Sequence, residues 1–363
     1  MSGYPLLCLG NPLLDIQANG DKALLNKYEL KSNDAILADE KHRFLYDDLT
    51  TKYHPKYLAG GAAQNSARGA QYALPPKSVV YVGCIGKDAF GEQVNDACVK
   101  EGVLTKYRID EDQLTGRCGV IITGLDRSMV TDLGAANHYK LEHLKSPEIW
   151  AYVEGAKIFY VGGFHLTVCV PAILALGEHA AETNKVFSMN LSAPFIPQFF
   201  KDQLDSVIPY CDYLIGNESE AIAYAESHNL DVSLPTPAIV TTTNSPTQSK
   251  DITAIAKAIA ALPKKNTSRP RTVVITQGTE PTIVVVGGAE PIVASYPVRP
   301  VSSKDIVDTN GAGDAFAGGF LAALVQGNEL KTAVDMGHWL ASWGIRELGP
   351  AYPAEKKLYS EST

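Results

Sequence analysis

The sequence has few cysteines, and none of them is spaced for a disulfide framework or a zinc site. The six cysteines form no CxxC pair and have no histidine at zinc spacing; they are residues 8, 84, 98, 118, 169 and 211. Small secreted domains depend on disulfides, whereas cysteines in the cytosol stay reduced. We therefore expect reduced thiols in a cytoplasmic protein, with the nucleus left open as a second location.

The sequence also lacks long apolar runs and blocks of like charge. Its first residues, Met-Ser-Gly-Tyr-Pro, contain no charged leader, and no window approaches the length of a membrane span. The net charge is −8, and no basic run exceeds the pairs Lys264-Lys265 and Lys356-Lys357. We therefore expect no nucleic-acid partner and no membrane association, and the lack of a long apolar strand edge favours a monomer.

Several nucleotide-binding and hydrolase signatures are missing. GxxxxGK[ST] does not occur, and the first apolar run is followed by Gly10-Asn11-Pro12 instead of GxGxxG. Gly311-Ala312-Gly313 lacks the third glycine of that fingerprint because Phe316 holds its position. GxSxG, HExxH and the protein-kinase signatures are absent as well. These absences exclude a P-loop enzyme by motif and disfavour a dinucleotide-dependent oxidoreductase.

What is present fits a soluble α/β protein. The 363 residues are 45% hydrophobic and 20% charged, and this length suggests one large unit and one smaller unit. The runs expected to be buried strands are 6–10, 78–82, 157–161, 186–189, 213–215, 239–242 and 273–276, alternating with helices such as 170–183 and 252–261. This alternation predicts a mostly parallel sheet covered by helices on both faces, with an antiparallel addition from 282–286 and 292–298.

Two segments fit poorly into this buried sheet. Residues 15–19 alternate like a strand with one wet face, and 117–123 and 129–133 flank a turn at 124–128 like a hairpin. The charged segment 22–53 predicts a helix around 40–49. We expect 13–60 and 113–138 to form a small β-sheet lid over a large domain of 1–12, 61–112 and 139–363. Because the lid segments are charged and sparsely apolar, we expect the lid to open without ligand and to close over it.

The stretch Asp308-Thr309-Asn310-Gly311-Ala312-Gly313-Asp314-Ala315-Phe316 predicts a glycine-rich turn that opens a helix. No bulky side chain keeps an anion away from the first N–H groups of that helix, where the helix dipole favours negative charge. Asp314 would repel a phosphate there unless a hydroxyl lay between them and gave up its proton to the carboxylate. Simple helix capping by Asp314 is the alternative.

The motifs resemble those of the ribokinase-like family of sugar and nucleoside kinases, from about residue 6 to about residue 353. The stretch 308–316 resembles the C-terminal signature of that family, Gly60-Gly61 with Asn65 its N-terminal signature, and 217–220 its NxxE motif. Within the family, the stretches 10–16, 83–86 and 190–195 resemble the members that phosphorylate adenosine. The resemblance implies a large α/β domain with a small β lid, in agreement with the pattern above.

The resemblance also implies a reaction, the transfer of the ATP γ-phosphate to the 5′-hydroxyl of adenosine in purine salvage. The products would be AMP and ADP. Asp314 would be the general base, and the amides of Gly311, Ala312 and Gly313, led by Asn310, would hold the transferred phosphate. Arg127, near the tip of the predicted hairpin, would clamp the phosphates; a solvated turn arginine is the alternative.

The adenosine site implied by the resemblance has a polar end and an apolar end. Asp15, Gly61 and Asn65 would hold the ribose, although Asp15 could be an exposed strand carboxylate and Asn65 a helix cap. The other residues assigned to adenosine are Asn11, Leu37, Cys118, Met129, Leu133 and Phe164. Ordinary packing is the alternative for Met129 and Leu133.

For ATP, the resemblance implies a second set of residues at the strand ends. They are Asn190, Asn217, Glu220, Thr276, Gln277, Gly278 and His338. Asn217 and Glu220 would organise Mg²⁺, with Glu220 acting through bound water because Mg²⁺ dehydrates reluctantly. A capping box between Asn217 and Glu220 and a core position for His338 are the alternatives.

Two positions depart from the family pattern, and two other functions compete with this reading. Ala62 stands where some relatives carry a hydroxyl, and Asp126 places a negative charge beside Arg127. The competing functions are a kinase for inosine, guanosine or a sugar, and a nucleoside sensor without catalysis. A slot around Phe164 favours a base over a bare sugar, and Asp314 after Gly-Ala-Gly disfavours a sensor.

Overall fold

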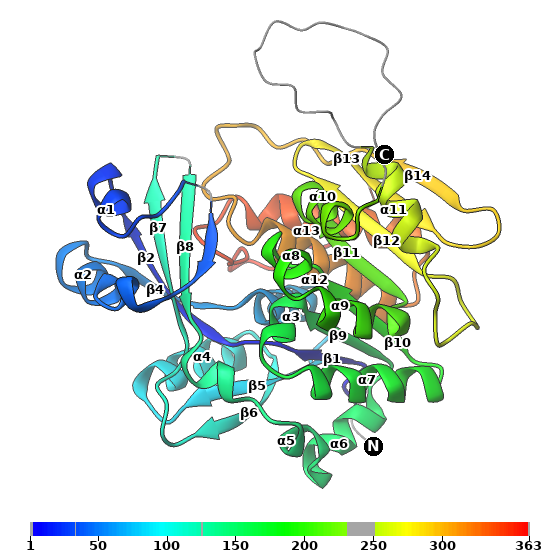
Figure 1. Cartoon of the computed structure of the whole chain (residues 1–363), viewed down its shortest axis with the longest axis horizontal. Helices are drawn as coiled ribbons and strands as arrows, with labels where there is room; N and C mark the ends of the chain where they lie inside the picture. Colours follow the sequence, from blue (N-terminus) through cyan, green and yellow to red (C-terminus); the bar gives the residue numbers. More distant parts are fainter. Residues whose placement is uncertain (1–2, 33, 125, 231–250, 362–363) are drawn as a thin grey trace, which may run out of the picture.

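The computed structural model describes residues 3–32, 34–124, 126–230 and 251–361. A large body of strands and helices carries a smaller sheet at one side (Figure 1). The strand predicted at 239–242 and Leu125 of the predicted hairpin turn lie outside the described residues.

The large body is built on a nine-stranded sheet. In spatial order the strands are β14 (Ile292–Tyr296), β13 (Glu280–Val286), β12 (Thr272–Gln277), β11 (Tyr213–Asn217), β10 (Val186–Asn190), β9 (Ile158–Gly162), β1 (Leu6–Leu9), β5 (Val79–Gly86) and β6 (Leu104–Asp110). The seven strands from β12 to β6 are parallel, while β13 and β14 add antiparallel at one edge. This arrangement confirms the predicted α/β fold and its antiparallel addition.

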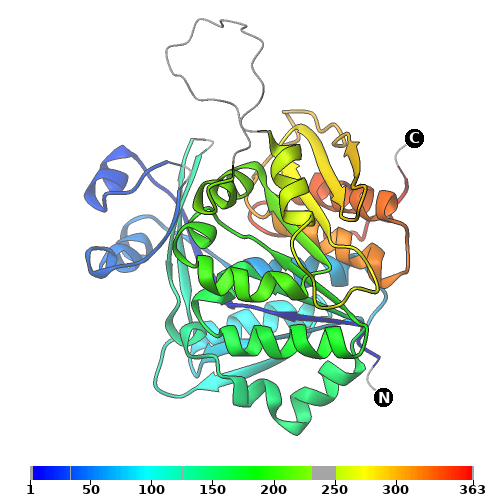
Figure 2. The same ribbon diagram turned by 45° about the vertical axis from the view of Figure 1, so that its right-hand side comes forward.

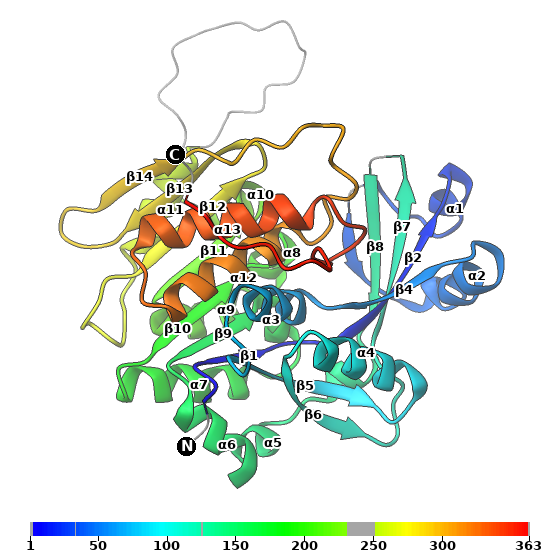
Figure 3. The same ribbon diagram turned by 180° about the vertical axis from the view of Figure 1, so that it is seen from behind.

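Helices cover both faces of this sheet because its strands are apolar on both sides. One face carries α5 (Leu141–Lys145), α6 (Pro147–Gly155), α7 (Val170–Glu182), α8 (Phe195–Phe199), α9 (Lys201–Val207), α10 (Glu218–Ser227) and α11 (Ile252–Ala260), seen in front in Figure 1. The other face carries α3 (Ala62–Ala73), α4 (Ala89–Lys100), α12 (Ala312–Val325) and α13 (Leu330–Gly344), seen in front in Figure 3. Each layer encloses its own apolar core.

Short 3₁₀ turns connect several of these elements. They are η1 (Glu40–His42), η2 (Gly134–His138), η3 (Gly163–Thr167) and η4 (Ile208–Tyr210). The helix predicted at 40–49 is split, with η1 at its start and α2 (Leu45–Lys52) following, and Phe44 lies between them as the N-cap residue of α2.

The second sheet has five strands, in the order β3 (Ala35–Leu37), β8 (Asp126–Asp132), β7 (Arg117–Thr123), β2 (Leu13–Asn19) and β4 (Lys56–Gly60). Two helices, α1 (Lys22–Lys27) and α2, cover its outer face, and the sheet stands between them and the large body (Figure 2). The predicted hairpin is confirmed as the antiparallel pair β7 and β8.

The prediction of a half-wet strand at 15–19 is wrong. β2 is buried on both faces up to Ala18, because one face packs under α1 and α2 and the other faces the large body. The small sheet also has an apolar core of its own, which includes Ile16, Leu45, Ile121 and Val130, so it is not sparsely apolar. The polar side chains on β2, such as Gln17, are buried because they have partners elsewhere in the fold.

Candidate active site

A cavity of about 420 Å³ opens between the small sheet and the carboxyl ends of the parallel strands. Asn11, Gly162, Asn190 and Asn217, each at or just after the end of a strand, line it. The cavity therefore lies at the carboxyl edge of the parallel strands, where open α/β sheets commonly bind ligands. The other predicted residues that line the cavity are Asp15, Leu37, Gly61, Asn65, Cys118, Arg127, Met129, Leu133, Phe164, Glu220, Asn310, Gly311, Ala312, Gly313 and Asp314.

The predicted glycine turn forms the wall of the cavity where α12 begins. Gly311 has φ of 77°, a left-handed conformation that glycine adopts without strain, and α12 starts at the next residue. The amide of Ala312 donates to the carbonyl of Thr309 at 3.2 Å. Of the three amides predicted to hold an anion, only that of Ala312 therefore has a backbone acceptor among the described residues.

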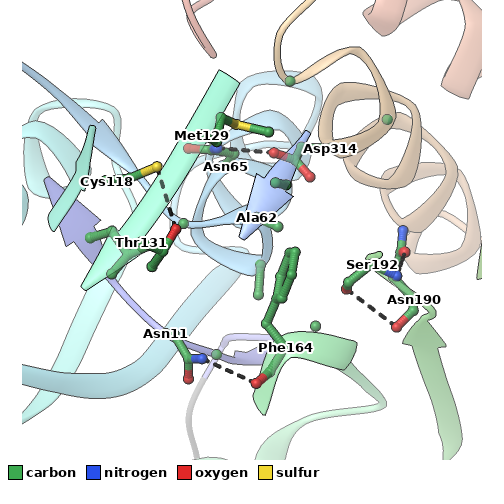
Figure 4. Close-up of a pocket in the computed structure, with 18 of the residues that line it drawn as sticks. Asn11, Ala62, Asn65, Cys118, Met129, Thr131, Phe164, Asn190, Ser192 and Asp314 are labelled. Atoms are coloured by element: carbon green, nitrogen blue, oxygen red, sulfur yellow. Dashed lines mark hydrogen bonds between the residues drawn. The ribbon is translucent and has the colours of Figure 1, made fainter. Parts of the chain in front are cut away.

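Asp314 stands in the first turn of α12, with its carboxylate inside the cavity wall. Asn65, on α3, donates from Nδ2 to Asp314 Oδ2 at 2.9 Å (Figure 4). Burial raises the pKa of Asp314 to about 7, and the Asn65 hydrogen bond and the charge of Arg68 oppose this rise. A carboxylate with this pKa can accept a proton near neutral pH. Asn65 contacts Asp314 directly, so capping of its own helix is not its role here.

Asp15 is a buried carboxylate on β2, and it lies against the backbone of β4. A Cβ on Gly60 would lie 2.1 Å from Asp15 Oδ1, so only glycine leaves room for this side chain. Burial, together with the negative charge of Asp314, raises the pKa of Asp15 to about 7, and the charge of Arg68 opposes this rise. The two carboxyl groups are thus near neighbours, and the idea of an exposed strand carboxylate at Asp15 is wrong.

The opposite end of the cavity is apolar. The Phe164 ring stands inside the cavity, facing Met129, Cys118 and Thr131 of the small sheet (Figure 4). Phe195 adds a second ring, with its centroid 5.9 Å from that of Phe164. A flat, largely apolar group can lie in this slot.

Asn11 is held in one orientation beneath this slot. Its Nδ2 donates to the carbonyl of Phe164 at 3.2 Å, and its Oδ1 lies 2.6 Å from Nδ1 of His165. Because Asn11 Oδ1 can only accept, the neutral His165 ring donates from Nδ1. Burial lowers the pKa of His165 to about 3, so the ring stays neutral.

Arg127 lies on β8 and is not a solvated turn residue. Its Nε donates to Asp308 Oδ1 at 3.1 Å, and Gln17 Nε2 of β2 donates to Asp308 Oδ2 at 3.1 Å. Asp308 also accepts from the amides of Asn310 at 2.9 Å and Gly349 at 3.0 Å. One fully buried carboxylate therefore connects two strands of the small sheet to the glycine turn at the start of α12.

Asn217 and Glu220 form the capping box that was the alternative for this pair. Asn217 Oδ1 accepts from the Glu220 amide at 2.9 Å and from Ser219 Oγ at 2.7 Å, so its oxygen is occupied. Glu220 accepts from the amide and from Nδ2 of Asn217, at 3.0 Å each, and burial raises the pKa of Glu220 to about 7. Its carboxylate is held rigidly at the cavity wall, while Asn217 offers no free oxygen to a metal.

Four residues assigned to ATP do not line this cavity. Thr276, Gln277 and Gly278 lie at the end of β12, where Thr276 donates to the Gly216 carbonyl at 3.3 Å and Gln277 to the Pro281 carbonyl at 2.6 Å. His338 is buried on α13, with Nε2 2.8 Å from Thr282 Oγ1, and its ring packs against Phe316. The structure thus places His338 in the core, which was the alternative for this residue.

Several cavity residues were not predicted. Besides glycines and alanines, they are Leu13, Asp34, Ile36, Thr131, His165, Thr167, Ser192, Phe195 and Thr309. Ser192 and Phe195 stand within the stretch 190–195 quoted for the family resemblance, which could have identified them. Asp34 and Ile36 lie in a charged region without periodicity, so only the fold brings them to the cavity.

Comparisons with known proteins agree with this geometry. The model of the pfkB family carbohydrate kinases matches residues 22–357. The adenosine kinases of Schizosaccharomyces pombe and Saccharomyces cerevisiae are each 48% identical to the chain; the first alignment covers 99% of both chains, the second 98% of this chain and 99% of the relative.

Solved structures show the same likeness. Anopheles gambiae adenosine kinase with P1,P4-di(adenosine-5) tetraphosphate has a TM-score of 0.88 and 42% identity, covering 96% of this chain and 98% of that chain. Schistosoma mansoni adenosine kinase with 2-fluoroadenosine has a TM-score of 0.87 and 35% identity, covering 98% of each. The matches extend over nearly the whole chain, and they include the glycine turn, the buried acid and the cavity between the two sheets. The chain therefore belongs to the ribokinase-like, pfkB family of carbohydrate kinases.

Proposed function

We propose that this protein is an ATP-dependent adenosine kinase that transfers the γ-phosphate of ATP to the 5′-hydroxyl of adenosine, giving AMP and ADP. One observation carries the proposal: Asp314, held by Asn65, stands beside the amides of Gly311 and Gly313 at one end of a cavity whose other end is the Phe164 slot. A hydroxyl between acid and amides would meet a proton acceptor and an anion site together.

In the proposed reaction Asp314 accepts the proton of the attacking hydroxyl. A positioned base contributes about 10²–10⁴-fold to a rate. The amides at the start of α12 and the helix dipole stabilise the charge on the transferred phosphoryl group, where one donor is worth roughly 2.7–4 kcal/mol. Arg127, already at the cavity wall, adds a positive charge on the side of the small sheet. The rest of catalysis is positioning.

Adenosine fits the cavity with its ribose at the polar end and its base at the apolar end. Asp15 accepts from the ribose hydroxyls, a charge-assisted contact, while Gly61 lets the sugar approach the backbone. The base lies against Phe164 with Leu37, Cys118, Met129 and Leu133 around it. Asn11, fixed by His165, borders the same end.

ATP enters from the side of Asn190 and Asn217, and residues 276–278 at the end of β12 extend that side. His338 has no part in it. Mg²⁺ prefers oxygen ligands and keeps several waters, and it usually binds through one or two carboxylates and substrate phosphates. The single rigid carboxylate of Glu220 fits such an ion through water, whereas Asn217, with its oxygen occupied, does not. Bound Mg²⁺ would neutralise charge on the phosphates.

The proposal includes the remaining general features of the protein. We place it in the cytoplasm because its six cysteines are buried free thiols. We further propose a monomer, and a division into a lid of 13–60 and 113–138 and a large domain of the remaining segments. In the described residues, helices long and apolar enough to cross a membrane are absent.

The test is ATP consumption with adenosine, inosine, guanosine and ribose side by side, with and without Mg²⁺. We expect turnover with adenosine and Mg²⁺, and at least about tenfold lower kcat/KM for the other acceptors. The reason is that a base that fits the Phe164 slot gains binding free energy there. The Asp314→Asn variant serves as the blank. Preferred turnover of inosine, guanosine or ribose would show that this acceptor, and not adenosine, is the substrate. Adenosine binding without any turnover would favour a sensor.

A further inference from the structure

Behind the cavity wall, a buried arginine touches the residue that holds Asp314. Arg68 lies one turn after Asn65 on α3, is 5% exposed and does not line the cavity. Its Nη1 lies 3.4 Å from Asn65 Oδ1, and Asn65 Nδ2 donates to Asp314. A chain of polar contacts thus runs from Arg68 through Asn65 to the proposed base.

Arg68 is itself held by a two-pronged ion pair. Its Nε and Nη2 donate to the two oxygens of Glu101, at 2.8 and 2.6 Å, and Nη1 also donates to the carbonyl of Ala59 at 3.0 Å. A fork-to-fork pair of this kind fixes the plane of the guanidinium. Arg68 therefore joins α3, the end of α4 and β4 of the small sheet.

The chemistry of Arg68 decides which way the Asn65 amide faces. A guanidinium has donors only, so it can face the oxygen of Asn65 but not its NH₂ group. With the oxygen turned to Arg68, the NH₂ group must face Asp314, and it can donate there to a carboxylate. If the amide were reversed, its oxygen would meet the Asp314 carboxylate, an arrangement that favours the protonated acid.

We propose that Arg68 is a positioning residue for phosphoryl transfer: anchored on Glu101, it fixes the Asn65 amide so that Asp314 is kept as the proton-accepting carboxylate. This inference rests on the proposed role of Asp314 as the base. The charge of Arg68 acts in the same direction, since it lowers the pKa of both Asp314 and Asp15 against the effect of burial. A merely structural clamp between α3, α4 and β4 is the competing account.

Other charged and titratable groups surround this chain of contacts and must be counted in any pH experiment. They are Asp15 on β2, Glu220 on α10, Tyr160 on β9, Cys98 and Glu101 next to Arg68, and Tyr352, whose hydroxyl donates to the Asn65 carbonyl at 3.4 Å. Arg127 on β8 lines the same cavity. A kinetic profile alone therefore does not identify the group that titrates.

The test follows the Asp314 carboxyl directly. In full-length protein with ¹³Cγ-labelled aspartate, the Asp314 resonance is identified by its loss in Asp314→Asn and titrated in wild type and in Arg68→Met. We expect the midpoint to rise by at least about 0.5 pH unit in Arg68→Met, because an opposite charge and a hydrogen bond to the carboxylate are lost. The acid limb of kcat should move up with it, so that turnover lost at neutral pH returns at higher pH.

Two further variants keep the test decisive. Arg68→Gln removes the charge with a smaller change if Arg68→Met does not fold, and Arg68→Lys should restore part of the shift. The matched control is Arg299→Met, since Arg299 makes a similar forked pair with Asp335 away from the cavity. This control should lose stability but keep the wild-type midpoint.

An unchanged Asp314 midpoint in both neutral variants would overturn the proposal, whether turnover fell equally at every pH or not at all. The titration needs no substrate. It therefore decides the role of Arg68 even if the wild-type protein fails to phosphorylate adenosine, a result that would reject the proposed function separately.

Discussion

Three carboxyl groups at the cavity share one cause for their raised pKa values but differ in their partners. Burial dominates for Asp15, Asp314 and Glu220, each with a pKa of about 7. Asn65 supports the charged form of Asp314, and the Asn217 amide supports that of Glu220, while Asp15 is opposed by its neighbour Asp314. These different partners are consistent with the different roles proposed above for Asp314 as base, Glu220 near the metal and Asp15 at the sugar.

Gly313 allows a separation of folding from phosphate binding. A Cβ at this position would meet no atom within 4 Å, because it would point into open space at the start of α12. We expect Gly313→Ala to fold with unchanged or slightly higher stability, since alanine favours a helix by roughly 0.5–1 kcal/mol. The added methyl group should lower kcat/KM for ATP by about tenfold or more, because it occupies the anion site.

Thermal unfolding and steady-state kinetics check this prediction, with adenosine binding as the internal control. Full activity in a variant that folds normally would show that phosphate binds elsewhere.

Gly60 tests the placement of Asp15. Since a Cβ there would lie 2.1 Å from Asp15 Oδ1, Gly60→Ala must displace this carboxylate. We expect the KM for adenosine to rise by about tenfold or more while the KM for ATP changes little, because a charge-assisted contact is worth about 1.5–3 kcal/mol. Parallel titrations with the two substrates measure this split. Equal effects on both substrates would show that the variant disturbs the whole cavity.

Among the elements, α12 carries the site because glycines let it pack closely on its neighbours. A Cβ on Gly318 would lie 2.8 Å from the Ser66 carbonyl of α3, and one on Gly319 would lie 2.3 Å from the Met336 carbonyl of α13. These are backbone contacts, which cannot give way like a flexible side chain. The start of α12, with Asp314, is thereby fixed against Asn65 of α3.

Gly319→Ala should therefore push α12 and α13 apart. We expect a loss of about 1–3 kcal/mol in the free energy of unfolding, the usual cost of overpacking. Urea unfolding measures it, with Gly344→Ala as control, since a Cβ there would first meet only the Ala315 Cβ, at 3.3 Å. The same loss in both variants would argue against close backbone packing as the cause.

The sequence was enough to predict those elements that have a strong local signal. Within the described residues, the predicted buried strands of the large sheet, α7, α11 and the glycine turn at 311 appear where periodicity and turn residues placed them. The short helix α1 and strand β3 were missed because they have only six and three residues, too few to show a helical or a strand period. β2 was read as half-exposed because its polar side chains look solvent-facing until Asp308 and the cavity supply partners.

The site residues likewise divide into those with a local sequence signal and those without one. Residues in motifs, such as Asp314 and Asn65, could be predicted together, whereas their direct contact and the arginine behind it could not. His165 and Asp308 had no sequence signal for their roles, since the role of a buried histidine or aspartate depends on partners far along the chain. His338 was assigned to ATP from the family resemblance, but packing against Phe316 puts it in the core.

At the scale of the whole molecule, the cavity has walls from both sheets, and Asp308 connects them. Gln17 and Arg127 of the small sheet reach the buried carboxylate beside the glycine turn at the start of α12. A movement of the small sheet would therefore have to break or carry along these two contacts. This coupling gives the expected closure a physical link to the phosphate end of the site.

We predict that the small sheet closes over adenosine. Small-angle scattering should show a smaller radius of gyration with adenosine than without it, because closure of a lid over substrate excludes water from the cavity. The Gly60→Ala variant, with weakened adenosine binding, is the control and should need more ligand for the same change. Identical curves at saturating adenosine would contradict the closure.

The central claim is that Asp314 takes the proton of the attacking hydroxyl beside the amides of α12, and Asp314→Asn tests it most directly. The substitution keeps the shape of the side chain and removes the base. Calorimetric titration with adenosine and single-turnover phosphoryl transfer should be measured on the same preparation. We predict adenosine binding close to that of wild type and turnover lower by at least about 10²-fold. Wild-type turnover in Asp314→Asn would contradict the account.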